Sequence, residues 1–157
     1  MEPLNTHNKN EYPPAHTAEH ILNQTMVRFF GCSRSKNAHI ERKKSKCDYQ
    51  LPQSPTPEQV AHIEQQVNDI IQADLPVTIS IVPRESVVGL VDLSKLPEHA
   101  SSQLRIVRIG DYDCCACIGA HVEHTAQIGA FRIISHDYNE GCWRVRFKVD
   151  APESSPL

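Results

Sequence analysis

Two histidines, His16 and His20, stand four residues apart in the sequence HTAEH, and the later sequence CIGAH repeats this interval with Cys117 and His121. Imidazole nitrogens and a thiolate are ligands that zinc prefers, and four of them complete a tetrahedral site. The pairs lie far apart in the chain, so the fold must bring them together. Either pair can also arise by chance, in which case its members are ordinary surface or core residues.

The first pair falls in a predicted helix over residues 16–30, because apolar positions recur there at helical spacing and Gly31 follows as a termination signal. The histidines fall on the opposite side of the helix from the apolar stripe. The histidine pair therefore lies outside the predicted core. The predicted buried face consists of Ala18, Leu22, Thr25 and Phe29, and the histidine face also carries Asn23 and Gln24.

The other elements follow from β-branched runs, apolar periodicity and turn signals. They predict an α+β fold, a two-layer sandwich in which a largely antiparallel sheet packs against two main helices. One domain is expected over residues 1–157, with 1–12 and 150–157 poorly ordered. The predicted elements are strands at 38–41 and 46–51, a helix at 57–73, strands at 76–82 and 103–110, and strands at 128–135 and 142–149 around a turn, with a short helix and a loop within 83–102.

Composition limits the class of protein. The 157 residues are 39% hydrophobic and 22% charged, with a net charge of -3. No apolar run is long enough to cross a membrane and no signal peptide is visible, so a cytoplasmic protein without membrane contact is expected. The sequence leaves the oligomeric state open, and a monomer is favoured. Three of the six cysteines crowd beside His121, which favours metal binding or reactive thiols over disulfides. Of these, Cys114 and Cys115 are expected to be small buried neighbours, with Cys115 as an alternative to Cys117.

The sequence HTAEHIL, followed by CIGAHVEHTAQIGAFRI, resembles the editing domain of alanyl-tRNA synthetase and its free-standing relatives, the AlaX proteins. It is more distantly similar to the editing domain of threonyl-tRNA synthetase. The resemblance covers about residues 16–149, and without an aminoacylation domain the chain looks like the short AlaX type. It implies deacylation, in trans, of tRNA-Ala mischarged with serine or glycine.

The resemblance also implies a zinc ion held by His16, His20, Cys117 and His121, acting as Lewis acid or template. Four protein ligands close a tetrahedral shell. Catalysis would then need a fifth position, a ligand that steps aside, or a site with three bound ligands.

Two residues between the first histidines are the candidate catalytic residues. Thr17 is expected to contact the hydroxyl of a mischarged serine, because a site built to bind a hydroxyl rejects an analogue that lacks it. Glu19 is expected to carry a proton or to hold a liganding histidine. The alternatives are a threonine without a ligand role and a solvated helix charge.

A tRNA partner should leave a trace in the charge pattern. Seven of the sixteen Lys and Arg residues fall within 28–46, and basic residues alternate with apolar ones in the last strand. The alternative is a solvated hairpin and an ordinary surface strand. The candidate phosphate contacts are Arg42, Lys43, Lys44, Lys46, Arg144 and Arg146.

Two other functions fit the same residues. A non-catalytic module could keep the zinc site and the basic surface for holding tRNA. Alternatively, a zinc hydrolase could act on another small ester or amide, with the basic run incidental.

Overall fold

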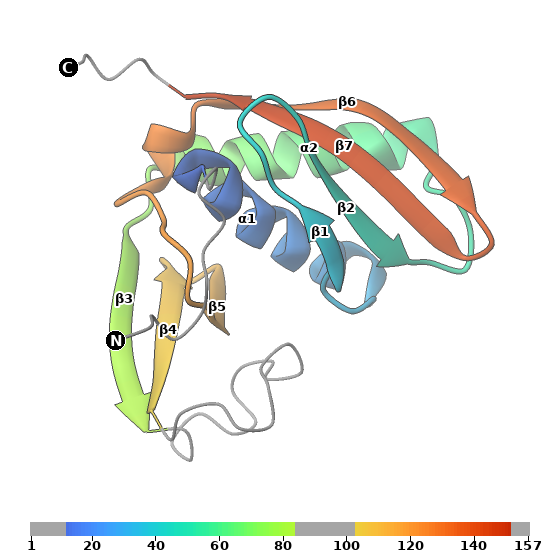
Figure 1. The fold of residues 1–157 in the computed structure, drawn as a ribbon. Helices are drawn as coiled ribbons and strands as arrows, with labels where there is room; N and C mark the ends of the chain where they lie inside the picture. The colour runs from blue at the N-terminus through green and yellow to red at the C-terminus, as the bar shows by residue number, and fades with distance from the viewer. Residues whose placement is uncertain (1–11, 84–102, 152–157) are drawn as a thin grey trace.

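The computed structural model describes residues 12–83 and 103–151 (Figure 1). In these residues the strands form a four-stranded sheet with the order β1-β2-β7-β6 and a three-stranded sheet with the order β3-β4-β5, and every pairing is antiparallel. The predicted α+β class is confirmed. The elements are α1 (Pro13–Phe30), β1 (Asn37–His39), β2 (Ser45–Gln50), α2 (Pro57–Gln72), β3 (Val77–Pro83), β4 (Gln103–Ile109), β5 (Asp113–Ala116), the 3-10 turn η2 (Thr125–Ile128), β6 (Ala130–Asn139) and β7 (Cys142–Asp150).

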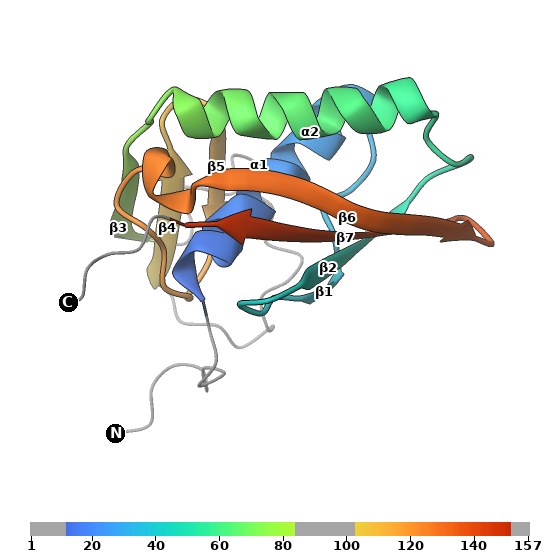
Figure 2. The same cartoon turned by 90° about the horizontal axis from the view of Figure 1, so that it is seen from above.

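Helix α1 lies between the two sheets, and α2 runs beside β6 (Figures 1 and 2). Alternate residues of β7 point into the core, where they pack with apolar side chains of both helices. The helix α2 begins at a capping box made by Thr56 and Gln59. No helix in the described part of the chain is long and apolar enough to cross a membrane. The shared core includes Ala18, Leu22, Ile63, Val67, Trp143, Val145 and Phe147.

The helix α1 is more deeply buried than its apolar stripe predicts. It ends at Gly31 as expected, where the left-handed glycine donates its N–H to Val27 O at 2.8 Å. His20 is only 4% exposed and Asn23 only 2%, whereas Phe29, predicted to be buried, is 43% exposed. The reason is that elements pack on several sides of α1, so its polar face also meets protein.

Three strand predictions need correction. The strand β5 was missed, since its sequence DCCA has no β-branched residue. The turn predicted at 136–141 is shorter, because β6 continues to Asn139 and only Glu140 and Gly141, both with positive φ, connect it to β7. Residue Asp150, expected to be poorly ordered, ends β7. The other predictions for 1–11, 84–102 and 152–157 lie outside the described residues.

The segment after CIGAH is fastened to the fold by Thr125 and Gly129. The Thr125 hydroxyl donates to Ile70 O at 2.9 Å and accepts from the Leu75 N–H at 2.8 Å, which ties η2 to the end of α2. Gly129 has φ 78° and lies so close to β7 that an added Cβ would come within 2.0 Å of Asp150 O. A larger residue has no room there.

Replacement of this glycine tests the close approach. We expect Gly129→Ala to lower the free energy of unfolding by clearly more than Gly31→Ala, measured by chemical denaturation. Gly31 has a similar φ of 68° but nothing within 4 Å of an added Cβ, so its variant should lose only the left-handed backbone cost of about 1–2 kcal/mol. Equal losses in the two variants would show that the contact with β7 does not require glycine.

Candidate metal centre

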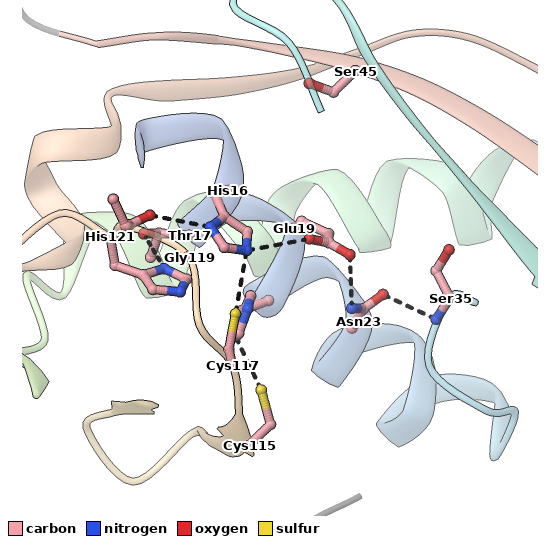
Figure 3. Close-up of polar contacts among 12 residues, drawn as sticks. His16, Thr17, Glu19, Asn23, Ser35, Ser45, Cys115, Cys117, Gly119 and His121 are labelled. Atoms are coloured by element: carbon pink, nitrogen blue, oxygen red, sulfur yellow. Dashed lines mark hydrogen bonds and ion pairs between the residues drawn. The ribbon is translucent and has the colours of Figure 1, made fainter. Parts of the chain in front are cut away.

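The four predicted ligands meet at the junction of α1 and the loop that follows β5 (Figure 3). One ligand atom from each of His16, His20, Cys117 and His121 lies within 4.8 Å of the others. The rings of His16 and His121 stack with centroids 4.2 Å apart, and Cys117 Sγ lies 3.4 Å from His16 Nε2. These side chains can hold a metal ion.

The loop carrying Cys117 is held by Arg105 of β4, a residue that the sequence did not single out. Its guanidinium donates to Cys117 O at 2.9 Å and to Gly119 O at 2.6 Å, and the Cys117 N–H donates to Arg105 O at 3.0 Å. Arg105 therefore fixes the backbone on both sides of Ile118. Its position in a strand gives no local signal of this role.

Contacts at one ring nitrogen orient two of the imidazoles. His16 Nδ1 lies 3.1 Å from Ala120 O, and since a carbonyl only accepts, Nδ1 carries the proton and Nε2 faces Cys117. His121 Nδ1 lies 2.9 Å from Thr17 Oγ1, whereas its Nε2 is buried with no hydrogen-bond partner among the described residues. A buried polar atom of this kind requires an explanation, and a metal ion would supply the missing partner.

The protonation states of Cys117 and His121 also suit a metal. Burial opposes ionisation of Cys117, but the neighbouring imidazoles of His121, His16 and His20 lower the pKa of this thiol to about 2. Burial, together with repulsion from His20 and His16 when these are protonated, lowers the pKa of His121 to about 4. Thiolate and neutral imidazole are the forms that bind metals. Despite burial, Cys117 raises the pKa of His16, and Cys115 with Asp113 raises that of His20, so a metal must displace protons from these two rings.

A second group with metal-binding side chains shares His20. His20, Asp113 and Cys115 are all buried, and their ligand atoms also lie within 4.8 Å of one another. His20 Nδ1 lies 3.2 Å from Cys115 Sγ and 3.6 Å from Asp113 Oδ2. Cys115 is thus a buried neighbour of the first group, as the sequence predicts, whereas Cys114, expected to be buried too, is only partly buried. Asp113 was missed, because nothing in the sequence pairs it with a histidine so far away.

Thr17 lies beneath the cluster with its hydroxyl already engaged. It is fully buried, accepts the Val122 N–H at 3.2 Å and pairs with His121 Nδ1. Contact with a substrate hydroxyl would have to replace one of these bonds. The geometry therefore gives Thr17 a role in orienting His121, and its contact with substrate stays a prediction.

Glu19 lies at the edge of the cluster and is only 6% exposed, so the alternative of a solvated helix charge is wrong. Its Oε1 is 4.0 Å from His16 Nε2, and Asn23 Nδ2 donates to its Oε2 at 3.4 Å. The Asn23 amide is itself fixed, because its oxygen accepts from the Tyr49 hydroxyl at 2.6 Å and the Ser35 N–H at 3.2 Å. These contacts aim the Asn23 donor at Glu19 (Figure 3).

The predicted phosphate contacts lie in two places. Arg42, Lys43 and Lys44 are exposed between β1 and β2, and Lys46 of β2 pairs across the strands with Arg146 of β7.

The two arginines of β7 already have acidic partners. Arg144 makes two hydrogen bonds to Asp48, at 2.8 and 2.9 Å, and Arg146 lies 3.0 Å from Asp137. Their positive charge is therefore partly neutralised, in contrast to the exposed lysines of the turn.

Comparisons with known proteins show what the chain is similar to. Residues 104–146, which include Cys117 and His121, match the family described as the threonyl and alanyl tRNA synthetase second additional domain. The alanine–tRNA ligase of Caldicellulosiruptor saccharolyticus is 33% identical over 121 residues, and that of Coxiella burnetii is 31% identical over 128. These matches cover 76% and 81% of this chain but only 14% of each ligase. The chain therefore corresponds to a small part of such relatives.

Metal analysis of purified protein without a histidine tag tests the ligand set. We expect Cys117→Ala to lose most of the bound metal, because the thiolate is the only anionic donor in the group of four. Cys114→Ala is the matched control, since Cys114 belongs to neither group of candidate ligands among the described residues. Equal metal content in the two variants would exclude Cys117 as a ligand.

Proposed function

Because the chain belongs to the alanyl-tRNA synthetase editing-domain-like superfamily, we propose that it is an aminoacyl-tRNA deacylase that removes serine or glycine from mischarged tRNA-Ala in trans. The observation that supports this proposal is that His16 and His20 meet Cys117 and His121 in one group, in which the buried Nε2 of His121 has no partner among the described residues. The reaction is hydrolysis of the ester between the amino acid and the terminal ribose.

Zinc is the metal that suits three imidazoles and one thiolate best. We propose His16, His20, Cys117 and His121 as its ligands. When bound, zinc would polarise a water molecule or the ester carbonyl. Proton transfer and substrate choice are proposed for side chains next to the ligands.

Glu19 is the proposed proton carrier. Its carboxylate is adjacent to the ligand histidine His16 and is held by Asn23, so it can accept a proton from water as the water attacks the ester carbonyl. When the ester bond breaks, the same carboxyl group returns the proton to the departing ribose oxygen. The water thus supplies a hydroxyl group to the amino acid and a proton to the tRNA.

Thr17 is the proposed source of substrate choice. The position of His121 depends on the Thr17 hydroxyl, and Thr17 lies directly behind the ligand loop. A pocket that hydrogen-bonds the serine hydroxyl leaves polar groups unpaired when alanine enters, which favours removal of serine over the correct amino acid.

A deacylation assay with tRNA-Ala charged separately with serine, glycine and alanine tests the function. We expect release of serine or glycine well above that of alanine, and a loss of about 10²- to 10⁴-fold in kcat/KM for Glu19→Gln, because the amide cannot accept the proton. Charged species no less stable than in buffer alone would contradict the proposal. Binding of tRNA without hydrolysis would indicate a binding module instead.

The salt dependence of the reaction tests the tRNA contacts. We propose that Arg42, Lys43, Lys44, Lys46, Arg144 and Arg146 bind phosphates, with the exposed lysines contributing most. The double variant Lys43→Glu, Lys44→Glu should raise KM for tRNA and flatten the plot of log affinity against log salt by about 0.7 to 0.9 for each lost contact. Hydrolysis that responds neither to these changes nor to salt would favour a hydrolase of another small ester.

A further inference from the structure

We infer that Asp113 is a positioning residue for His20, and that Arg34 both holds Asp113 in place and excludes a second metal from the group formed by His20, Asp113 and Cys115. The inference deepens the metal part of the proposed function and rests on it. It assigns roles to Asp113 and Arg34 that the sequence pattern does not suggest.

His20 has a thiol and a carboxylate at the same ring nitrogen. Its Nδ1 lies at hydrogen-bond distance from Cys115 Sγ, 3.2 Å, and at ion-pair distance from Asp113 Oδ2, 3.6 Å. A carboxylate only accepts, so a protonated Nδ1 suits this side of the ring. The other ring nitrogen is then left unprotonated for a metal, and a carboxylate behind a liganding histidine also raises its basicity.

Asp113 is itself held by two side chains. Its side chain is buried, and its Oδ1 accepts from Arg34 Nη1 at 2.7 Å and from Gln24 Nε2 at 2.9 Å. Its Oδ2 accepts from Arg34 Nη2 at 3.1 Å and is the oxygen that faces His20. Arg34 therefore donates hydrogen bonds to both oxygens of the carboxylate. These bonds fix the plane of the Asp113 carboxylate and its orientation toward the His20 imidazole.

Arg34 disfavours the alternative that His20, Asp113 and Cys115 form a metal site of their own. Arg34 Nη2 also lies 3.7 Å from Cys115 Sγ, so the guanidinium spans two of the three potential ligands. The positive charge of Arg34 would repel a metal cation bound by these side chains, and burial would strengthen the repulsion. We therefore expect a single metal ion, in the group that contains Cys117.

The charge of Arg34 gives Asp113 a second function that must be separated from the first. Loss of Asp113 alone would leave a largely buried guanidinium without its anion, and such a variant can fail to fold. The test therefore includes a variant that lacks both Arg34 and Asp113. In this variant His20 has lost the Asp113 carboxylate, but no buried guanidinium is left without its anion.

The experiment measures zinc affinity and stoichiometry by competition with a chromophoric chelator in wild-type protein and three variants. Asp113→Asn and the double variant Arg34→Met, Asp113→Leu are each expected to lose about 10- to 100-fold in zinc affinity, the usual effect of removing such a partner. Asp111→Asn is the matched control, because Asp111 is exposed two residues away and loses the same charge. Circular dichroism and thermal unfolding establish that the double variant is folded.

The outcomes separate the possible roles. A folded double variant with wild-type affinity would show that Asp113 only balances Arg34, and two zinc ions per wild-type chain would show that the second group is a site; either result overturns the inference. Wild-type protein without zinc affinity would overturn both this inference and the proposed zinc centre. Normal zinc binding without deacylation would overturn the proposed activity alone.

Discussion

The junction of α1 with the loop after β5 depends on ionisable side chains that are buried or partly buried in the protein. Such groups cost free energy in a core unless each finds partners of suitable charge or hydrogen-bonding type. Here the Cys117 thiolate faces imidazoles, and Asp113 faces Arg34 on one side and His20 on the other. One atom, His121 Nε2, lacks such a partner among the described residues, and it belongs to the group best suited to hold a metal.

Much of the remaining structure holds α1 and the loop after β5 in fixed positions relative to each other. Arg105 ties the ligand loop to β4, so the three-stranded sheet places Cys117, while the packing of α1 in the core places His16 and His20. Beyond the loop, Thr125 attaches the chain to α2 and so limits how far the segment after His121 can move. Groups contributed by distant elements are thereby held close together before any ligand binds.

The sequence predicted the helices and most strands because their signals are local. The capping box at Thr56 and the glycine at position 31 mark helix ends without reference to the rest of the chain. The site was predictable as far as its residue types recur at a regular interval, together with the family resemblance. Burial of Glu19 and exposure of Phe29 were not predictable, because they depend on which elements surround α1.

Arg34 shows most clearly why the rest of the site could not be predicted. In the sequence it belongs to a basic run and looks like a solvated charge, whereas in the structure it binds Asp113, 79 residues later. Neither residue has a local pattern that reveals the pair, and only the fold brings β5 against the chain that follows α1. Ion pairs between residues so far apart in the chain produce no periodic pattern in the sequence, so they cannot be predicted from it.

X-ray absorption spectroscopy at the zinc edge of the loaded protein tests the proposed centre most directly. We expect one sulfur at about 2.3 Å and nitrogen ligands at about 2.0–2.1 Å, from Cys117 and the histidines. Two sulfur ligands would place Cys115 on the metal and contradict the role given to Arg34. A shell without sulfur would exclude Cys117 and with it the proposed ligand set.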